Sequence, residues 1–365
     1  MGNRGLNRVS LPPHLYTLAD YARAAQARMD PAVWAWLEGA SGDGAARRRE
    51  EASFAAHALL NRPLADLRGG HTRRRLLGLD LAHPVLLSPL GYHGLIHPEG
   101  ELATAQGCLE TVMTVSTMAS QPIEAIAQVA AGPLWFQLYV QPRREDTLRL
   151  IRRAEAAGAR AIVVTLDTPA QPASPQALRA GFVMPPGIAA VHLSGFAPAP
   201  EAPGDWYNPA LSRLAAAAPG WEDMAWLRGQ TDLPLLAKGL SRADDAVRLM
   251  ALGWDGLVLS THGGRAMEAA AAPLTLLPAM RAALGRDRAI LLDGSVRTGA
   301  DAFRALALGA DAVMVGRPQL HGLAVGGALG VAHMLKILRE ELELAMVLAG
   351  CATLDAIGPD ALTGV

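Results

Sequence analysis

Eight short apolar runs, separated by stretches with helical character, most constrain how this chain can fold. Each run is too short for a helix, and each ends close to glycine, proline or a polar residue. The runs cover residues 85–88, 111–116, 134–140, 161–165, 235–237, 256–260, 289–292 and 312–315. Alternation of strand and helix implies a parallel sheet covered by helices, and eight such units predict an α/β fold, a (β/α)₈ TIM barrel.

The remaining segments are predicted to serve this barrel. Hydrophobic residues make up 51% of the 365 residues, so a large core is available. Residues 1–60 are predicted to form an N-terminal helical prelude that is too short for a core of its own. Residues 170–226, after the fourth run, are rich in Pro, Ala and Gly, and we expect them to form a lid loop over a substrate. We therefore predict one barrel domain over residues 1–365.

Charge and cysteine content exclude several classes of protein. The net charge is −1 and no basic block occurs, which gives nucleic-acid binding no electrostatic support. Cys108 and Cys351 lie outside any metal-ligand spacing, so neither structural zinc nor a disulfide scaffold is expected. The N-terminus lacks an apolar signal core, and no apolar run reaches the roughly 20 residues that span a membrane. We expect a cytoplasmic protein without membrane partners that acts on a small molecule.

The last two runs both end in a glycine followed by an arginine. Gly294 precedes Arg297, and Gly316 is next to Arg317. Glycine lets the backbone approach a bound group closely, and the arginine fork of N–H donors pairs with phosphate. We call these four residues the phosphate clamp and predict that it lies at the top of the last two strands. The alternative interpretation is two ordinary turns with solvated arginines.

His262 is the leading candidate for a general base, because it follows the sixth run and its ordinary pKa is near 6.5. Asp167, on the same rim, is placed to orient it. Lys238, at the end of the fifth run, could pair with a carboxylate, form a Schiff base or place positive charge near an anionic cofactor. A structural histidine and a plain ion pair are the alternatives.

Neutral polar groups end three neighbouring runs: Ser116, Gln137 and Thr165. Such donors and acceptors suit the edge of a flat heteroaromatic ring. Tyr139 adds a hydroxyl on the same rim, unless it only packs. A phosphate clamp, a cation and a ring of neutral polar groups together suggest flavin mononucleotide (FMN).

Several segments resemble the FMN-dependent 2-hydroxy-acid oxidases and dehydrogenases, a family that includes glycolate oxidase, lactate oxidase and mandelate dehydrogenase. These segments are LPLLAKGL, LVLSTHGGR, LLDGSVRTGADAFRALALGADAVMVGRP, FQLYV and HPEGE. The resemblance extends from about Leu18 to the C-terminus. It implies a (β/α)₈ barrel that holds FMN at the carboxyl ends of the strands, oxidation of a substrate carbon that faces flavin N5, and a homotetramer.

The resemblance also implies roles for individual residues. The base of the family falls on His262 and its aspartate partner on Asp167, while Tyr139 and Arg265 match substrate-binding groups. Lys238 would stabilise negative charge on the reduced flavin. The implied flavin contacts are Pro89, Leu90, Gly91, Ser116, Gln137, Thr165, Lys238, Ser260, Asp293, Gly294, Ser295, Arg297, Gly316 and Arg317.

The chain departs from the family on the substrate side. A second substrate arginine is replaced by Ser174, and a tyrosine of the prelude by Ala35. The remaining departures are Met118 for an aromatic residue, Leu90 for a threonine and Ser295 for a glycine. Removing one partner of a desolvated charge pair costs about 2–5 kcal/mol. We therefore predict a substrate larger and more apolar than glycolate or lactate, in specialised metabolism, with Arg179 or Arg265 alone binding its carboxylate.

Other functions stay open from the sequence alone. FMN could serve the oxidation of another group, such as an amine or a modified peptide, or an isomerisation without net oxidation. A flavin-free phosphate-binding barrel isomerase and a non-enzymatic flavoprotein are further alternatives. The electron acceptor is also open, although Gly91 is expected to leave space for oxygen near flavin N5.

Overall fold

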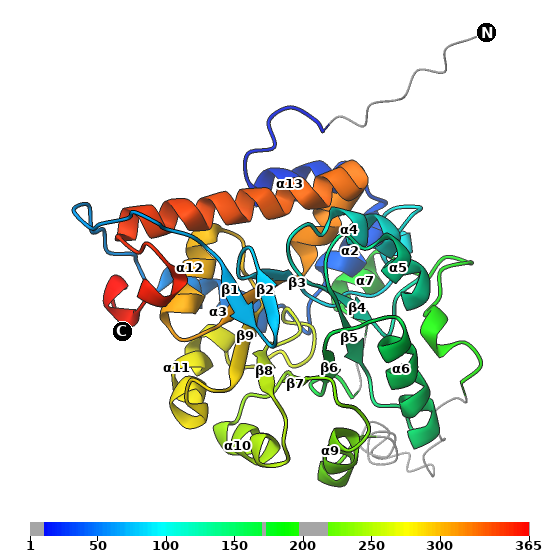
Figure 1. Ribbon diagram of the computed structural model, residues 1–365. Helices are drawn as coiled ribbons and strands as arrows, with labels where there is room; N and C mark the ends of the chain where they lie inside the picture. The colour runs from blue at the N-terminus through cyan, green and yellow to red at the C-terminus, as the bar shows by residue number, and fades with distance from the viewer. Residues whose placement is uncertain (1–10, 170–172, 197–217, 365) are drawn as a thin grey trace.

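A computed structural model describes residues 11–169, 173–196 and 218–364 of the chain. Eight parallel strands close into a barrel in the order β10-β3-β4-β5-β6-β7-β8-β9 (Figure 1). The strands are β3 (Val85–Leu87), β4 (Met113–Ser116), β5 (Leu134–Leu138), β6 (Ile162–Thr165), β7 (Leu235–Lys238), β8 (Gly256–Leu259), β9 (Ala289–Asp293) and β10 (Ala312–Val315). Each predicted run overlaps one of these strands, which confirms the (β/α)₈ barrel.

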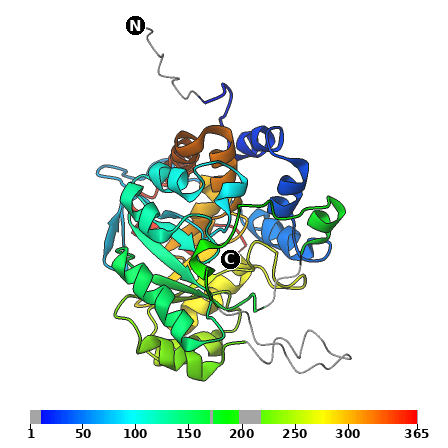
Figure 2. The same cartoon turned by 90° about the vertical axis from the view of Figure 1, so that its right-hand side faces the viewer.

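Helices between the strands cover the outside of the barrel, as the two views at right angles show (Figures 1 and 2). They are α4 (Glu101–Gly107), α5 (Ile123–Val129), α6 (Arg144–Ala156), α9 (Trp221–Arg228), α10 (Ala243–Ala251), α11 (Pro273–Leu284), α12 (Gly299–Ala307) and α13 (Arg317–Ala349). The short 3₁₀ helices are η1 (His93–Leu95), η2 (Val191–Leu193), η3 (Leu354–Ala356) and η4 (Pro359–Ala361).

The long helix α13 consists of two helices joined at a kink, because Gly326 and Gly327 have non-helical backbone angles. By length and composition α13 is apolar enough to cross a membrane, yet half of its most apolar window is buried inside the protein. It packs along α1, α4 and α12. Its apolar character is therefore accounted for in large part by core packing.

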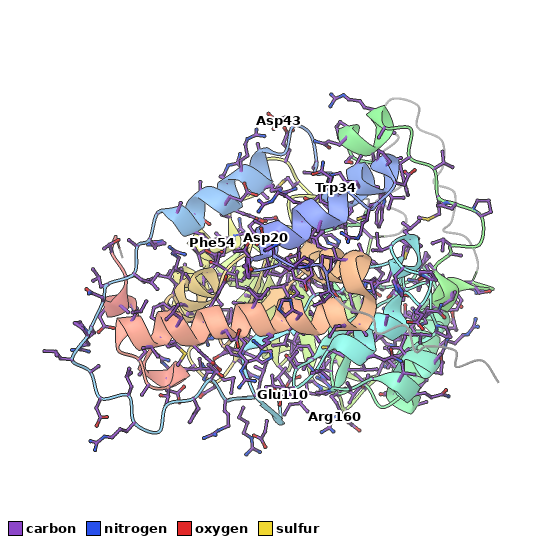
Figure 3. All side chains as sticks on the ribbon, turned by 90° about the horizontal axis from the view of Figure 1, so that it is seen from above. Asp20, Trp34, Asp43, Phe54, Glu110 and Arg160 are labelled. Carbon is purple, nitrogen blue, oxygen red and sulfur yellow. The ribbon has the colours of Figure 1, made fainter. Side chains whose placement is uncertain are left out.

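The prelude consists of α1 (Leu18–Gln26), α2 (Pro31–Glu38) and α3 (Ala45–Ala55). Thr17 and Asp20 form a capping box at the start of α1, and Asp30 caps α2. Trp34 of α2, labelled in Figure 3, stacks on His321 of α13 with 5.4 Å between ring centroids. The prelude is thus packed against the barrel through α13.

A hairpin of β1 (Arg74–Leu76) and β2 (Leu79–Leu81) was not predicted from the sequence. Its strands are only three residues long, and a run of three arginines hides their alternation. Leu76, Leu79 and Leu81 form one apolar cluster with inward-facing barrel residues such as Trp135. The hairpin, cyan in Figure 1, therefore closes the amino-terminal end of the barrel.

The predicted lid, residues 170–226, is only partly covered by the structure, because residues 170–172 and 197–217 lie outside the described residues. The described part contains α7 (Pro175–Arg179), η2 and the start of α9. The expectation of a segment without regular structure was therefore wrong for these residues, since Pro175 at the first position and a Ser174 cap start a helix. A lid function stays a prediction.

Side chains inside the barrel change from apolar to polar at one level. Inward-facing apolar residues are Leu86, Trp135, Val163, Leu236, Val258, Leu291 and Met314. Because side chains of a strand alternate with period two, the next inward positions lie two residues further along. These positions are Ser88, Gln137, Thr165, Lys238, Ser260, Asp293 and Gly316. The barrel therefore has a dry lower core and a polar upper layer.

Gly299 is where α12 comes closest to α13, and a β-carbon there would overlap the backbone of Glu341 and Leu342. We expect Gly299→Ala to destabilise the protein by about 1–3 kcal/mol, because overpacking against backbone forces the two helices apart. Gly229→Ala is the matched control, since its added carbon would only make an ordinary contact with Trp226. Urea unfolding of both variants checks this, and equal stabilities would contradict it.

Candidate active site

A cavity of about 550 Å³ opens above the polar layer, at the carboxyl ends of the strands. Most residues singled out from the sequence line this cavity: Pro89, Leu90, Gly91, Ser116, Gln137, Tyr139, Thr165, Lys238, His262, Arg265, Asp293, Gly294, Ser295, Arg297, Gly316 and Arg317. Ser260 and Asp167 are not part of this lining, but Ser260 forms a hydrogen bond with Asp293, and Asp167 forms one with His262. The strand ends thus bring together side chains that are up to 228 positions apart, from Pro89 to Arg317.

Lys238 and Asp293 form a buried ion pair at the base of the cavity, with 2.9 Å between Nζ and Oδ2. The Ser260 hydroxyl accepts a hydrogen bond from Lys238 (2.8 Å) and donates one to Asp293 (2.8 Å). Burial opposes charge on the lysine, but the Asp293 and Asp167 carboxylates raise the pKa of Lys238 above its ordinary value. Lys238 is therefore a fixed cation, which disfavours the Schiff-base alternative because that chemistry needs the neutral amine.

His262 and Asp167 are brought together as the sequence analysis predicted. The Nδ1 atom of His262 lies 3.3 Å from Asp167 Oδ1, and its backbone N–H donates to Ser260 Oγ (2.9 Å). Gly239, with a φ of +97°, leaves room for Asp167, which a β-carbon would strike. Burial and the charge of Lys238 lower the pKa of His262, whereas Asp167 works in the opposite direction. The imidazole is therefore neutral at pH 7, with Nε2 left to accept a proton.

The two arginines of the phosphate clamp face the same cavity. The guanidinium of Arg317 donates to three main-chain carbonyls: Leu37 (3.0 Å), Gly39 (2.9 Å) and Gly263 (3.0 Å). Burial lowers the pKa of Arg317 to about 9. Arg297 donates to the carbonyl of Val296 (2.9 Å), and burial lowers its pKa as well. The alternative of a solvated turn is wrong for Arg317, which is only 7% exposed.

The first turn of α13 adds to this positive site. Gly316 precedes the helix and supplies no side-chain cap to its N–H groups. Helix N-termini favour anions because free N–H groups and the helix dipole point toward them. Two buried guanidinium groups beside such a terminus can hold a phosphate group.

Buried donors without partners line the opposite part of the cavity. Within the part of the chain that the structure describes, Gln137 Nε2 and Thr165 Oγ1 are buried and have no hydrogen-bond partner. Ser116 donates to Gln137 Oε1 (3.1 Å), which aims the amide nitrogen away from Ser116. Buried polar atoms in native proteins are rarely left unsatisfied. These atoms are accounted for by a bound group with acceptors at its edge.

Aromatic residues form the outer wall of the cavity, and the sequence analysis missed them. Trp36 of α2 stacks on Phe182 (5.5 Å between centroids, 25°) and meets Tyr92 edge to face (6.2 Å). Arg265 lies over the Trp36 ring at 5.5 Å, and its Nη1 donates to the carbonyls of Trp36, Leu37 and Gly39. Met118 and Leu193 continue this wall. The sequence did contain a signal for Trp36, because this aromatic residue directly follows Ala35, the position that the resemblance assigned to the substrate side.

Two expectations about this wall were wrong. Neither Ala35 nor Ser174 lines the cavity, and the Ser174 hydroxyl instead accepts the N–H of Ala177 (3.1 Å) to cap α7. Arg179 is exposed on α7 and does not reach the cavity. Gly91 lines the cavity, and a β-carbon there would lie 2.7 Å from the β-carbon of Met118, while space for oxygen beside it stays a prediction.

Comparison with known proteins gives a consistent result. A family model described as FMN-dependent dehydrogenase matches residues 25–364. An L-lactate oxidase of Alicycliphilus denitrificans is 48% identical over 97% of this chain and 98% of its own length. An L-lactate oxidase of a Roseobacter species is 40% identical over 95% of each chain. The crystal structure of a mandelate oxidase with (S)-2-phenylpropionate superposes with a TM-score of 0.86 at 34% identity, covering 95% of this chain and 98% of that one.

The ion pair at the base of the cavity gives a stability prediction. We expect Lys238→Met to destabilise the protein by about 3–5 kcal/mol at pH 8, because it leaves the Asp293 carboxylate buried without a cation. The pKa of Asp293 is then raised in the folded state, so the loss is present above the unfolded pKa and shrinks toward pH 5 as the carboxyl takes up a proton.

Lys336→Met is the matched control, because Lys336 pairs with Glu340 on the surface with 61% of its side chain exposed. We expect a change below about 1 kcal/mol for this variant. Urea unfolding at both pH values measures the difference. Similar losses in the two variants, or a loss independent of pH, would contradict the role given to the buried pair.

Proposed function

Since the chain belongs to the FMN-dependent dehydrogenase family, we propose that it oxidises a 2-hydroxy acid whose side chain is larger and more apolar than that of lactate. Its relatives are 2-hydroxy-acid oxidases that depend on FMN, and the protein is an oxidoreductase acting on CH–OH groups. The flavin-free isomerase considered from the sequence is thereby wrong. The proposal is carried by the His262–Asp167 pair, which faces the cavity beside the fixed cation Lys238.

The residues present fit FMN. Arg297, Arg317 and the first turn of α13 would hold the phosphate, and the unsatisfied donors of Gln137 and Thr165 would meet the edge of the ring. Bound FMN supplies an acceptor for the two electrons that leave the substrate. Lys238 places a fixed positive charge on the floor of the cavity, where it would stabilise negative charge.

His262 is proposed to act as the base. Its imidazole is neutral because burial lowers its pKa, so Nε2 can take the proton that leaves the substrate. Asp167, on the Nδ1 side, would hold the ring in place and stabilise the imidazolium that forms. Proton uptake by His262 and orientation by Asp167 would explain why the two residues lie together at the rim of the cavity.

Arg265 and Tyr139 are proposed to bind the substrate carboxylate. Nη1 of Arg265 is used by main-chain carbonyls, whereas Nε and Nη2 have no partner among the described residues and can form a two-point contact with a carboxylate. The side chain of the substrate would then lie against Trp36, Met118 and Leu193. An apolar and aromatic wall of this kind favours an aryl or long alkyl group.

The name of the mandelate oxidase neighbour indicates an aryl substrate. Because other relatives are named L-lactate oxidase, L-lactate is the substrate against which others are compared. A homotetramer stays a prediction from the resemblance, and a cytoplasmic location stays a prediction from the sequence.

A substrate panel tests the proposal. We expect (S)-mandelate and (S)-3-phenyllactate to be oxidised with a kcat/KM at least about tenfold above that of L-lactate, because burying an aryl group contributes about 1.5–3 kcal/mol. The measurement is the anaerobic bleaching of the flavin with each acid. Trp36→Leu is expected to erase the preference while leaving L-lactate turnover in place. If L-lactate or glycolate reduces the flavin fastest, the substrate assignment fails.

The pH dependence of kcat/KM tests the base. Since burial lowers the pKa of His262, the rate is expected to decline only below pH 6.5, where the imidazole becomes protonated. Asp167→Asn removes the influence that raises this pKa, so the decline shifts to lower pH, while kcat falls at least tenfold. Asp66→Asn, at an exposed site, serves as control. An unchanged profile with unchanged kcat in Asp167→Asn would exclude the proposed pair.

A further inference from the structure

Glu50 of α3 has a fully buried carboxylate that the proposed mechanism does not use. Its exposed fraction is 1%, and its two oxygens accept hydrogen bonds from the hydroxyls of Thr261 (at Oε1) and Ser295 (at Oε2, 2.7 Å). In the described part of the chain, none of its oxygens makes a salt bridge, and the nearby Arg317 pairs with Glu38 instead. A buried carboxylate without a cationic partner is costly and calls for an explanation.

One of the two hydroxyls belongs to the turn of His262, and the other belongs to the turn of the phosphate clamp. Thr261 directly precedes His262, and its hydroxyl oxygen also accepts the N–H of Gly264 (2.9 Å). Ser295 lies in the clamp between Gly294 and Arg297. Glu50 therefore reaches from the prelude to the turn of the base and to the turn of the phosphate clamp at once.

Both turns have backbone conformations that side chains rarely adopt. The φ angle of His262 is +60° and that of Ser295 is +50°. Non-glycine residues persist in this region only where their surroundings hold them there. At Gly294, with φ of +120°, a β-carbon would lie 2.9–3.0 Å from the Glu50 carboxylate, so the acid also fills the space under the clamp.

We propose that Glu50 is a positioning residue that holds the turn of His262 and the turn of the phosphate clamp in one arrangement, so that flavin retention and placement of the base depend on one carboxylate. This inference rests on the proposed function, because it takes His262 as the base and the clamp as the flavin site. A carboxylate suits the role because it only accepts, and both of its partners can donate.

Removing the hydroxyls one at a time separates the effect on flavin retention from the effect on placement of the base. Ser295→Ala should weaken FMN binding several-fold and accelerate hydrogen exchange of residues 294–297, while exchange of residues 261–264 stays as in the wild type. Thr261→Val should lower kcat several-fold, whereas Thr261→Ser should restore it, with FMN binding unchanged in both. These variants remain informative even if substitutions of Glu50 itself impair folding.

Substituting Glu50 should produce both effects together. We expect Glu50→Leu to raise the dissociation constant of FMN and to lower kcat at saturating FMN, each at least tenfold. Glu50→Gln keeps one acceptor and gains one donor, so it should recover most of both losses. Glu51→Leu is the matched control, because Glu51 is the next residue of α3 with half of its side chain exposed.

Readouts independent of turnover complete the test. FMN binding is followed by flavin fluorescence, and hydrogen exchange of residues 261–264 and 294–297 is measured in the flavin-free protein, where Glu50→Leu should accelerate exchange in both segments. If Glu50→Leu only lowers the melting temperature, with FMN affinity, kcat and its pH profile unchanged, the inference is wrong. If the wild type oxidises no 2-hydroxy acid, the proposed function fails, while the binding and exchange measurements still decide the role of Glu50.

Discussion

The rest of the structure depends on the change from apolar to polar side chains inside the barrel. Below that level the interior is packed with residues such as Trp135 and Met314, and the β1–β2 hairpin closes it. Above it, each strand contributes one inward position at its carboxyl end. A buried cation is tolerated there only because Asp293 and Ser260 satisfy Lys238 from two sides. Within the polar layer, Lys238, Asp293 and Ser260 are thus hydrogen-bonded to one another. Gln137 Nε2 and Thr165 Oγ1 have no partner among the described residues and can each bind an acceptor.

The prelude is part of the site, although its sequence shows no chemistry. Carbonyl groups at the end of α2 accept hydrogen bonds from both Arg265 and Arg317, and Glu50 of α3 reaches the turn of His262 and the turn of Ser295. A guanidinium bound to several carbonyls has little freedom left, so less conformational entropy is lost when it meets an anion. The N-terminal helices therefore pre-organise cations that the barrel alone would leave mobile.

Much of the fold, and many of the strand-end residues that line the cavity, could be predicted because both follow from local patterns. Short apolar runs bounded by glycine, proline or polar residues indicated all eight barrel strands, and for most of them the last residue of the run or the one after it is an inward position. The hairpin, Trp36 and Glu50 could not be found this way. Glu50 is 211 residues from Thr261 and 245 from Ser295, and only packing brings them together. The predictions for Ala35 and Ser174 failed for a related reason, because packing of α2 turns Trp36 rather than Ala35 to the cavity, and Ser174 caps α7.

The charges around the clamp indicate that flavin binding and folding are coupled. Arg317 lies in surroundings that lower its pKa to about 9, which means that burial has made its charge unfavourable. Glu38, at 3.9 Å, relieves part of this cost, and Arg297 and Arg265 add to it. A dianionic phosphate placed among these groups would repay the desolvation that the folded chain has already incurred. A ligand that binds only the folded state at a hundred times its dissociation constant contributes about 2.7 kcal/mol to stability. The same arginines that give the site its affinity therefore make the flavin-free protein the less stable form.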